Sequence, residues 1–344
     1  MHRVVVVTGG SAGVGRAVAV ELGHHGASVA LLARSPEGLE SARREVEQAG
    51  GRVLAIPTDV ADADAVENAA EHVERELGPI DVWINNATAT VFAPVDRISP
   101  EEYERVTKVA YLGSVHGTLA ALRRMKPRDR GHIIQVGSAL AYRAIPLQSA
   151  YCAAKHAIRG FTNSLRCELL HERSKVLLTM VQLPALNTPQ FTWSRAKMPN
   201  EPQPVPPIFQ PEVAARMIVS VIEKRRRELW VAAPTFLAIV GSKLAPAWLD
   251  HYLAKTAYAA QMTDKALNPE RPDNLFEPVV RGHRTHGPFD DGAKPKSALE
   301  WLVLHRALVF VVFLIALFIV AMLLSAGSLR EHVTRFAPES AAHF

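Results

Sequence analysis

Seven short runs of apolar, mostly β-branched residues alternate along the chain with longer amphipathic segments. The runs cover residues 3–8, 28–33, 52–57, 80–85, 131–137, 175–182 and 228–232, and the segments between them cover 14–25, 36–49, 62–77, 100–125, 149–171 and 211–225. Runs that are continuously apolar are typical of strands buried on both faces, and the intervening segments are long enough to be crossover helices. The pattern therefore predicts an α/β domain of the Rossmann type, a doubly wound parallel sheet of about seven strands.

An uninterrupted run of 18 apolar residues extends from Ala307 to Leu324. As a helix it would be about 27 Å long, close to the roughly 30 Å of a bilayer's hydrocarbon core. A buried core helix would need protein on all sides, whereas only 20 residues follow Leu324. We therefore expect one transmembrane helix within residues 301–327, contact with the membrane through residues 307–324, and a short tail over residues 328–344.

The rest of the chain divides at changes in composition. Residues 1–233 are assigned to the sheet domain, and residues 234–300 to a C-terminal extension of helical and irregular character, an adapter with a helix over 246–263. Proline and polar residues interrupt residues 199–211, where no helix can persist. This segment is expected to be a loop or flap.

Composition excludes several functional classes. A formal net charge of +5 on 344 residues gives no reason to expect a nucleic-acid partner. Cys152 and Cys167 are too few for a disulfide framework, no Cys/His cluster has metal-ligand spacing, and a reducing compartment fits best. The apolar run Val4–Val7 is too short for an export signal. We therefore expect no metal site, and a sheet domain on the cytoplasmic side of a membrane.

A glycine-rich turn follows the first predicted strand. It reads Thr8-Gly-Gly-Ser-Ala-Gly-Val-Gly15, and a helix begins within it. Such a turn brings backbone N–H groups close to a pyrophosphate at the positive end of the helix. A tight loop can need glycine for its conformation alone, but the position after the first strand favours a dinucleotide site. The candidate contacts are Gly9, Ser11, Gly13, Val14 and Gly15.

The end of the second predicted strand indicates which dinucleotide is bound. An acidic residue there would bind the ribose 2′-hydroxyl of NAD, but the sequence has Arg34 followed by Ser35. A guanidinium can fork onto phosphate oxygens, and the serine can add a hydroxyl donor. The alternative is a solvated loop arginine. The pattern favours NADP(H) as the cofactor.

Three side chains are candidates for catalysis. Tyr151 and Lys155 are four residues apart on a predicted helix and therefore share a face, and Ser138 directly follows the fifth strand. A neighbouring ammonium favours the phenolate and would lower the tyrosine pKa toward the working range. The serine can hydrogen-bond a substrate oxygen. A Tyr-x-x-x-Lys pair alone is weak evidence for a catalytic site. A serine at a strand end of a nucleotide-binding sheet makes that interpretation stronger.

These segments resemble the short-chain dehydrogenase/reductase family over about residues 3–232. The glycine-rich turn matches the family's TGxxxGxG motif, and Ser138 with Tyr151-Cys-Ala-Ala-Lys155 matches its active site. The resemblance implies that Tyr151 donates or accepts the hydroxyl proton, and that Lys155 lowers the tyrosine pKa and holds the nicotinamide ribose. It also implies that Ser138 fixes the carbonyl.

Two further segments carry the resemblance. Asp59-Val60 matches the family's adenine-side aspartate after the third strand, and Asn85-Asn86-Ala87 matches most of its NNAG motif. The resemblance implies cofactor contacts at Asp59, Val60, Asn85 and Ala87.

The sequence departs from the family pattern at three places. Thr88 stands where the NNAG motif has glycine, and Ala110 aligns with an asparagine that usually supports a proton-relay water. The segment Pro184–Thr188 resembles a PGxxxT motif but is one residue short and lacks its glycine. Thr188 is still expected beside the nicotinamide carboxamide.

The sequence thus favours a membrane-anchored, NADP-dependent carbonyl reductase or alcohol dehydrogenase that acts on a small molecule. The alternative is a non-catalytic NADP-binding scaffold or sensor at a membrane. An apolar substrate is suggested by the variable segment, which could equally be ordinary loop packing; its apolar residues are Phe191, Trp193, Met198, Ile208 and Phe209. A homo-oligomer through segments 100–125 and 149–171 is possible by resemblance.

Overall fold

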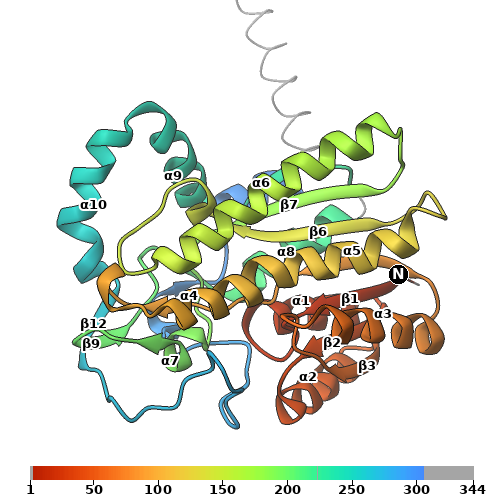
Figure 1. Ribbon diagram of the computed structural model, residues 1–344, viewed down its shortest axis with the longest axis horizontal. Helices are drawn as coiled ribbons and strands as arrows, with labels where there is room; N and C mark the ends of the chain where they lie inside the picture. Colours follow the sequence, from red (N-terminus) through yellow and green to blue (C-terminus); the bar gives the residue numbers. More distant parts are fainter. Residues whose placement is uncertain (1–2, 223, 306–344) are drawn as a thin grey trace, which may run out of the picture. The chain divides into compact units, whose positions relative to one another are not determined.

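The computed structural model describes residues 3–222 and 224–305, and its centre is a seven-stranded parallel sheet (Figure 1). The strands are β1 (Val4–Thr8), β2 (Ser28–Ala33), β3 (Arg52–Pro57), β4 (Ile80–Asn85), β6 (His132–Ser138), β7 (Leu177–Leu183) and β11 (Glu228–Trp230). Their order is β11-β7-β6-β4-β1-β2-β3. The chain therefore winds outward in both directions from β1 and β4, which confirms the doubly wound Rossmann-type sheet.

Helices cover both faces of this sheet. One layer contains α1 (Gly13–His24), α2 (Pro36–Gln48) and α8 (Pro211–Ile222), and the other contains α3 (Ala63–Leu77), α5 (Gly113–Met125) and α6 (Ser149–His171). Helix α3 shows why these segments are helical. Its buried residues Val66, Ala69, Ala70 and Val73 recur at helical spacing, and the Asp62 side chain caps its first N–H groups.

Segment 100–125 is not the single regular helix that the sequence predicts. Helix α4 (Pro100–Val106) passes into a π-helical turn, η2 (Thr107–Leu112), before α5 begins. Ser99 and Glu102 form a reciprocal capping box at the start of α4. Ala110 lies within the π-helical turn and is fully buried.

Further elements outside the sheet and its two helix layers form the flap, the C-terminal extension and the segments that pair with or precede the flap. They are β5 (Val91–Phe92), α7 (Gln190–Trp193), β8 (Arg195–Ala196), β9 (Asn200–Pro202), β10 (Ile208–Phe209), α9 (Ala233–Leu244), α10 (Pro246–Ala260), β12 (Met262–Ala266), β13 (Ala293–Lys294) and α11 (Ala298–Leu304). Strand pairs β9–β12 and β10–β13 tie the flap to the C-terminal extension, and β5 pairs with β8 just before the flap. The described residues up to Glu300 form one compact unit, which includes the C-terminal extension.

The predicted membrane segment falls outside the described residues. Among residues 3–222 and 224–305, no helix has both the length and the apolar character needed to cross a membrane. Residues 307–324, on which that prediction rests, are not among them.

Candidate active site

A cavity of about 410 Å³ opens at the carboxyl ends of the central strands. It lies where the winding direction changes between β1 and β4, which is where open α/β sheets bind ligands. Its wall comprises the glycine-rich turn, the ends of β2, β3, β4 and β6, part of α6, the segment after β7, and residues of the C-terminal extension.

The glycine-rich turn is built to bring its backbone close to a ligand. Gly9, Ser11, Gly13 and Val14 line the cavity, as predicted. Gly15 does not line it; a side chain there would collide with the carbonyl oxygen of Gly9, so this glycine allows the turn to close on itself. Helix α1 has Ala12 at its N-cap, which offers no side-chain acceptor to the first N–H groups of the helix. The turn can therefore accept an anion at the helix start.

The two adjacent asparagines after β4 have different surroundings. Asn85 is buried, accepts a hydrogen bond from Trp83 Nε1 (2.8 Å) and donates one to Thr118 Oγ1 (3.0 Å), so the structure places it in the core and not at the cavity. Asn86 lines the cavity, and its Nδ2 donates to the carbonyl of Thr8 (2.9 Å). Successive residues of a strand point to opposite sides, and this alternation was the signal that could have selected Asn86. Ala87 lines the cavity as expected.

The predicted 2′-phosphate residues line the cavity but already have protein partners. Arg34 donates from its terminal nitrogens to the carbonyl oxygens of Asn274, Leu275 (3.4 Å) and Phe276 (2.7 Å). Burial, and then repulsion from Arg105, lower the pKa of its guanidinium below the ordinary value. The Ser35 hydroxyl caps α2 by accepting from the Gly38 N–H (3.1 Å). A phosphate here would bind an arginine whose position is already fixed.

The adenine-side residues also line the cavity. Asp59 Oδ2 pairs with Arg105 (2.7 Å), and its Oδ1 accepts from the Ala61 N–H (3.0 Å). Val60 follows on the same wall, and Thr188 lies next to the glycine-rich turn, 3.3 Å from where a Cβ on Gly13 would be. Asp59, Val60 and Thr188 therefore lie at the cavity, as the resemblance implies.

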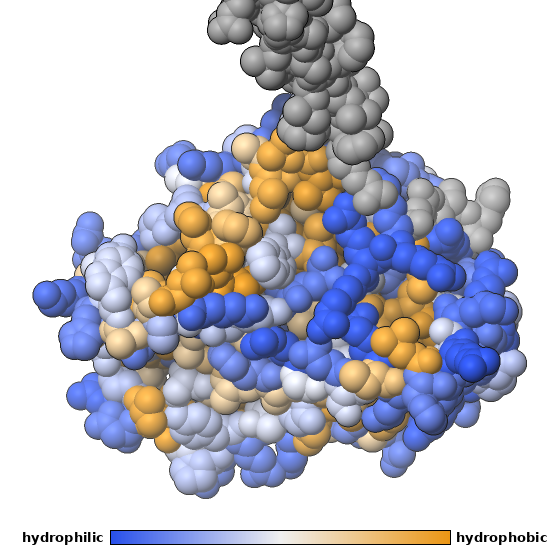
Figure 2. Space-filling model, turned by 90° about the horizontal axis from the view of Figure 1, so that it is seen from above, coloured by the Kyte–Doolittle hydropathy of each residue, from blue (hydrophilic) through white to orange (hydrophobic). Residues whose placement is uncertain are grey.

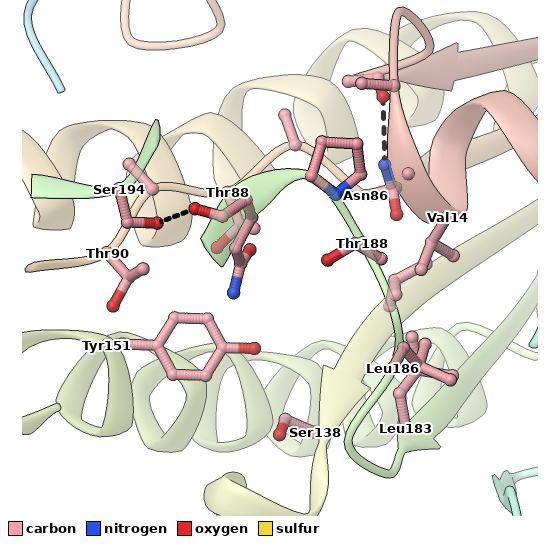
Figure 3. Close-up of a pocket in the computed structure, with 18 of the residues that line it drawn as sticks. Val14, Asn86, Thr88, Thr90, Ser138, Tyr151, Leu183, Leu186, Thr188 and Ser194 are labelled. Carbon is pink, nitrogen blue, oxygen red and sulfur yellow. Dashed lines mark hydrogen bonds between the residues drawn. The ribbon is translucent and has the colours of Figure 1, made fainter. Parts of the chain in front are cut away.

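The three catalytic candidates meet in this cavity, although they come from two elements. Ser138 ends β6, and Tyr151 and Lys155 share one face of α6. The Tyr151 hydroxyl points into the cavity on the side of Ser138 (Figure 3). Lys155 Nζ lies 5.5 Å from the centroid of the Tyr151 ring and donates to the Val136 carbonyl (2.8 Å).

Burial dominates the ionisation of this group. It raises the pKa of the Tyr151 phenol above its ordinary value, and a hydrogen bond with Ser138 acts in the opposite direction. It also lowers the pKa of Lys155 to about 8. The expected lowering of the tyrosine pKa by the lysine is not found, because burial is the largest influence on the phenol and acts in the opposite direction.

Only part of the predicted apolar wall reaches the cavity. Phe191 and Trp193 line it. Met198 packs instead against Phe92 and Leu147, and Ile208–Phe209 pairs with β13. Lining residues that sequence reasoning missed include four from the C-terminal extension: Asn274, Pro278, Val279 and His283. The first of them, Asn274, lies 63 residues beyond the end of the flap at residue 211, and no motif marks any of the four.

The lining residues fit a nicotinamide dinucleotide. The cavity is lined by the glycine-rich turn, whose backbone a ligand can approach closely, and by Asp59. It is also lined by Thr188 and by the three catalytic candidates. Arg34 supplies positive charge where a dinucleotide would place its adenosine end.

Comparisons with known proteins agree with this geometry. A family model described as short chain dehydrogenase matches residues 3–199. An uncharacterized oxidoreductase of Bacillus subtilis is 28% identical over 277 residues, which are 80% of this chain and 78% of that protein. The 3-dehydrosphinganine reductase of Danio rerio is 32% identical over 223 residues, 62% of this chain and 67% of that protein.

A solved structure gives the same result. The alcohol dehydrogenase of the archaeon Thermococcus sibiricus, complexed with 5-hydroxy-NADP, superposes with a TM-score of 0.59 at 27% identity and covers 67% of this chain and 96% of its own. Because the family model spans more than half of the chain, this protein belongs to the short-chain dehydrogenase family.

Proposed function

We propose that this NAD(P)-dependent short-chain dehydrogenase/reductase is a membrane-anchored, NADP(H)-dependent carbonyl reductase or alcohol dehydrogenase for an apolar substrate, with Tyr151 as the general acid/base. The observation that carries the proposal is the meeting of Ser138, Tyr151 and Lys155 in one cavity with the glycine-rich turn. A non-catalytic scaffold would not require a phenol and an ammonium at this place.

Each of the three side chains has a defined task. The nicotinamide cofactor supplies or accepts a hydride when bound. The Ser138 hydroxyl orients the substrate oxygen, and the Tyr151 phenol gives its proton to that oxygen in reduction or its phenolate takes a proton in oxidation. Lys155, with a pKa of about 8, is mostly protonated at neutral pH and stabilises the phenolate that reduction leaves behind.

The preference for NADP(H) is supported by charge at the end of β2. Arg34 brings a fixed guanidinium to the cavity wall, and no acidic side chain stands beside it at the end of that strand. The Thermococcus sibiricus relative was solved with an NADP derivative. A charge-assisted contact to a phosphate is worth about 1.5 to 3 kcal/mol, or about ten- to a hundredfold in affinity.

The apolar character of the substrate is supported by the outer part of the cavity. Leu140, Ile145, Leu186 and Phe191 line it together with the proline-rich flap segment 204–207. Thr88 and Thr90 lie on the same wall, and their buried hydroxyls have no hydrogen-bond partner in the described part of the chain. A substrate that is mainly apolar but carries one further polar group would satisfy both features.

Membrane association is supported by two separate features. The apolar run 307–324 is long enough to span a bilayer. In addition, the face shown in Figure 2 carries patches of apolar side chains. Large exposed apolar residues lie on α9 and α10, namely Phe236, Leu237, Leu244, Trp248, Tyr252 and Tyr258. Helix α9 also lines the cavity through Thr235 and Ala238, so an apolar surface adjoins the cavity.

The test is a screen of NADPH and NADH oxidation by the purified full-length protein against steroid, retinoid, fatty-acyl, long-chain keto and small carbonyl compounds. We expect turnover with NADPH on at least one apolar class. Tight NADPH binding without turnover of any class would favour the scaffold instead. Equal affinity for NADPH and NADH, in wild type and in Arg34→Ala, would contradict the cofactor preference.

A further inference from the structure

The C-terminal strap, residues 274–284, forms part of the mouth of the dinucleotide cavity. Asn274, Pro278, Val279 and His283 line the cavity, and Leu275 is fully buried in the core of the sheet domain. The strap is therefore packed against the cofactor domain as a wall of its site.

Three arginines of the cofactor domain hold the strap by its carbonyl groups. Arg34, after β2, donates to the carbonyls of residues 274–276. Arg105, on α4, donates from Nε to the Leu275 carbonyl (2.9 Å), and Arg16, on α1, donates to the His283 carbonyl (2.8 Å). The Gly13 N–H also donates to the Arg284 carbonyl (3.0 Å). The strap is thus fastened to each element that borders the adenosine end of the cavity.

His283 is the titratable side chain with which the strap faces this cavity. Its ring lies against the first turn of α2: a Cβ added to Gly38 would be 2.6 Å from the ring. On another side the ring packs on Trp193, with ring centroids 5.3 Å apart. The imidazole is therefore held between Gly38, in the first turn of α2, and Trp193 of α7.

The hydrogen bonds of His283 leave one ring nitrogen unused. Nε2 lies 2.7 Å from the Val279 carbonyl oxygen, which can only accept, so Nε2 carries a hydrogen. Nδ1 is buried and has no hydrogen-bond partner among residues 3–222 and 224–305. A buried polar atom without a partner in the wall of a ligand cavity marks a place where the ligand completes the hydrogen bonding. When protonated, Nδ1 donates to an anionic oxygen, and the strap fixes its direction.

We propose that His283 is a binding residue for the 2′-phosphate of NADP(H), supplied by the C-terminal strap and acting together with Arg34. This inference rests on the proposed preference for NADP(H). It assigns the strap a specificity role: its carbonyls at residues 274–276 orient Arg34, and its imidazole adds a second contact from the same cavity wall. Loss of one charge-assisted contact of this kind is expected to weaken binding about tenfold.

The experiment measures binding, not turnover. NADPH, NADH, adenosine 2′,5′-bisphosphate and adenosine 5′-monophosphate are titrated into the full-length protein, with quenching of tryptophan fluorescence or competition as the signal. The variants are His283→Ala and Gly38→Ala, the second of which displaces the ring and leaves its chemistry unchanged. The control is His286→Gln, since His286 pairs with Glu212 (2.8 Å) and does not line the cavity.

We expect both variants to bind NADPH and the 2′,5′-bisphosphate about tenfold more weakly than wild type, while NADH and the monophosphate change by less than about twofold. The control should match wild type for all four compounds. Gly38→Ala introduces the better helix former, so its effect cannot be assigned to unfolding of α2.

Two results would overturn the inference. If the two variants lost equal affinity for NADPH and NADH, His283 would contact a part of the cofactor that both molecules share. If neither variant changed any affinity, His283 would not contact the cofactor. A wild-type protein that binds no NADPH, or binds it no better than NADH, would instead overturn the proposed cofactor preference. The failures of the two proposals are therefore distinguishable.

Discussion

At the scale of single residues, Lys155 is a cation in a place that is unfavourable for charge. Its side chain is buried, and burial lowers its pKa from 10.5 to about 8. At pH 7 the group is still mostly protonated, so the folded chain carries a desolvation penalty. At 1.36 kcal/mol per pKa unit this penalty is about 3 kcal/mol.

We therefore predict that Lys155→Met raises the free energy of unfolding of the cofactor-free chain at pH 7. Removing the ammonium relieves the desolvation penalty of about 3 kcal/mol. Loss of its hydrogen bond to the Val136 carbonyl costs about 1 kcal/mol, so the net gain is about 2 kcal/mol. Between about pH 8 and pH 10.5 the unfolded wild type binds more protons than the folded one, so wild-type stability rises with pH and the gap narrows. Urea denaturation at pH 7 and pH 9 measures both effects. A less stable variant at pH 7 would contradict the argument.

Tyr151 gives the second prediction at this scale. Replacing it with phenylalanine removes the proton donor and leaves the ring in place, so turnover of a confirmed substrate should fall at least about a hundredfold, with NADPH affinity within about twofold of wild type. The matched control is Tyr142→Phe: that hydroxyl binds Glu228 (2.7 Å) and does not line the cavity. If Tyr151→Phe retained most of the wild-type rate, the phenol would not be the acid/base.

Residues whose role depends on local order along the chain could be predicted from the sequence. The Tyr151/Lys155 spacing, Ser138 at a strand end and the glycine-rich turn all meet at the cavity. Arg34 illustrates the opposite case, because its partners are carbonyl groups about 240 residues later. Backbone carbonyls have no sequence signature, so such a contact is visible only in the folded chain.

At the scale of elements, Glu102 connects α4 to β8, the strand that precedes the flap. Its carboxylate caps the Ser99 N–H (2.9 Å) and pairs with Arg195 (3.3 Å), which begins β8, and with Lys197 (2.7 Å), which follows it. Burial acts to raise its pKa, but the lysine, the Ser99 N–H and the arginine together lower it below the ordinary value. The buried carboxylate thus holds β8 in place against α4.

We predict that Glu102→Gln lowers the free energy of unfolding by about 2 kcal/mol at pH 7, because two cations then face a neutral amide. Because the Glu102 pKa is lowered on folding, its carboxylate stabilises the folded wild type at pH values above its unfolded pKa of 4.5. The difference in unfolding free energy between wild type and Glu102→Gln should therefore shrink as the pH falls below that value. Strand β8 should also loosen and raise the KM. Glu101→Gln, at an exposed position on the same turn, should stay within about 0.5 kcal/mol of wild type. Equal losses in the two variants would refute the contact with β8.

The sequence predicts helices and strands well where burial imposes a regular apolar pattern. It does not predict them where tertiary contacts determine the local structure. Strands β2, β3 and β4 have the predicted bounds; β2 and β4 are almost fully buried inside the sheet, and β3 is its partly exposed edge strand. The π-helical turn η2 interrupts segment 100–125 without a proline or glycine pair that would mark it. Helix α9 was missed because only Thr235 and Ile239 of its side chains are buried, which leaves little apolar periodicity.

At the scale of the whole molecule, the C-terminal extension belongs to the same compact unit as the sheet. Residues 3–300 form one compact unit, and Glu300 closes it by pairing with Arg216 (2.5 Å) and accepting from the Ser297 N–H (3.1 Å). This unit continues through residue 233, because the strap packs on the core of the sheet although it is rich in polar residues. The boundaries at residues 233 and 300 stay predictions from composition.

The last prediction follows from the end of this unit at Glu300. A chain that ends at His305 keeps Glu300 and its partners, so it should bind NADPH within about twofold of the full-length protein and should not need detergent. The full-length chain should stay in the membrane fraction through an alkaline carbonate wash. The matched variant is Leu314→Arg with Leu317→Arg, in the middle of the run 307–324. Each central arginine makes insertion less favourable by about 2.5 to 3.5 kcal/mol, so this variant should appear in the wash. Full-length wild type in the wash would show that the run does not span the bilayer, and a truncated chain that loses NADPH binding would show that residues beyond His305 complete the cofactor site.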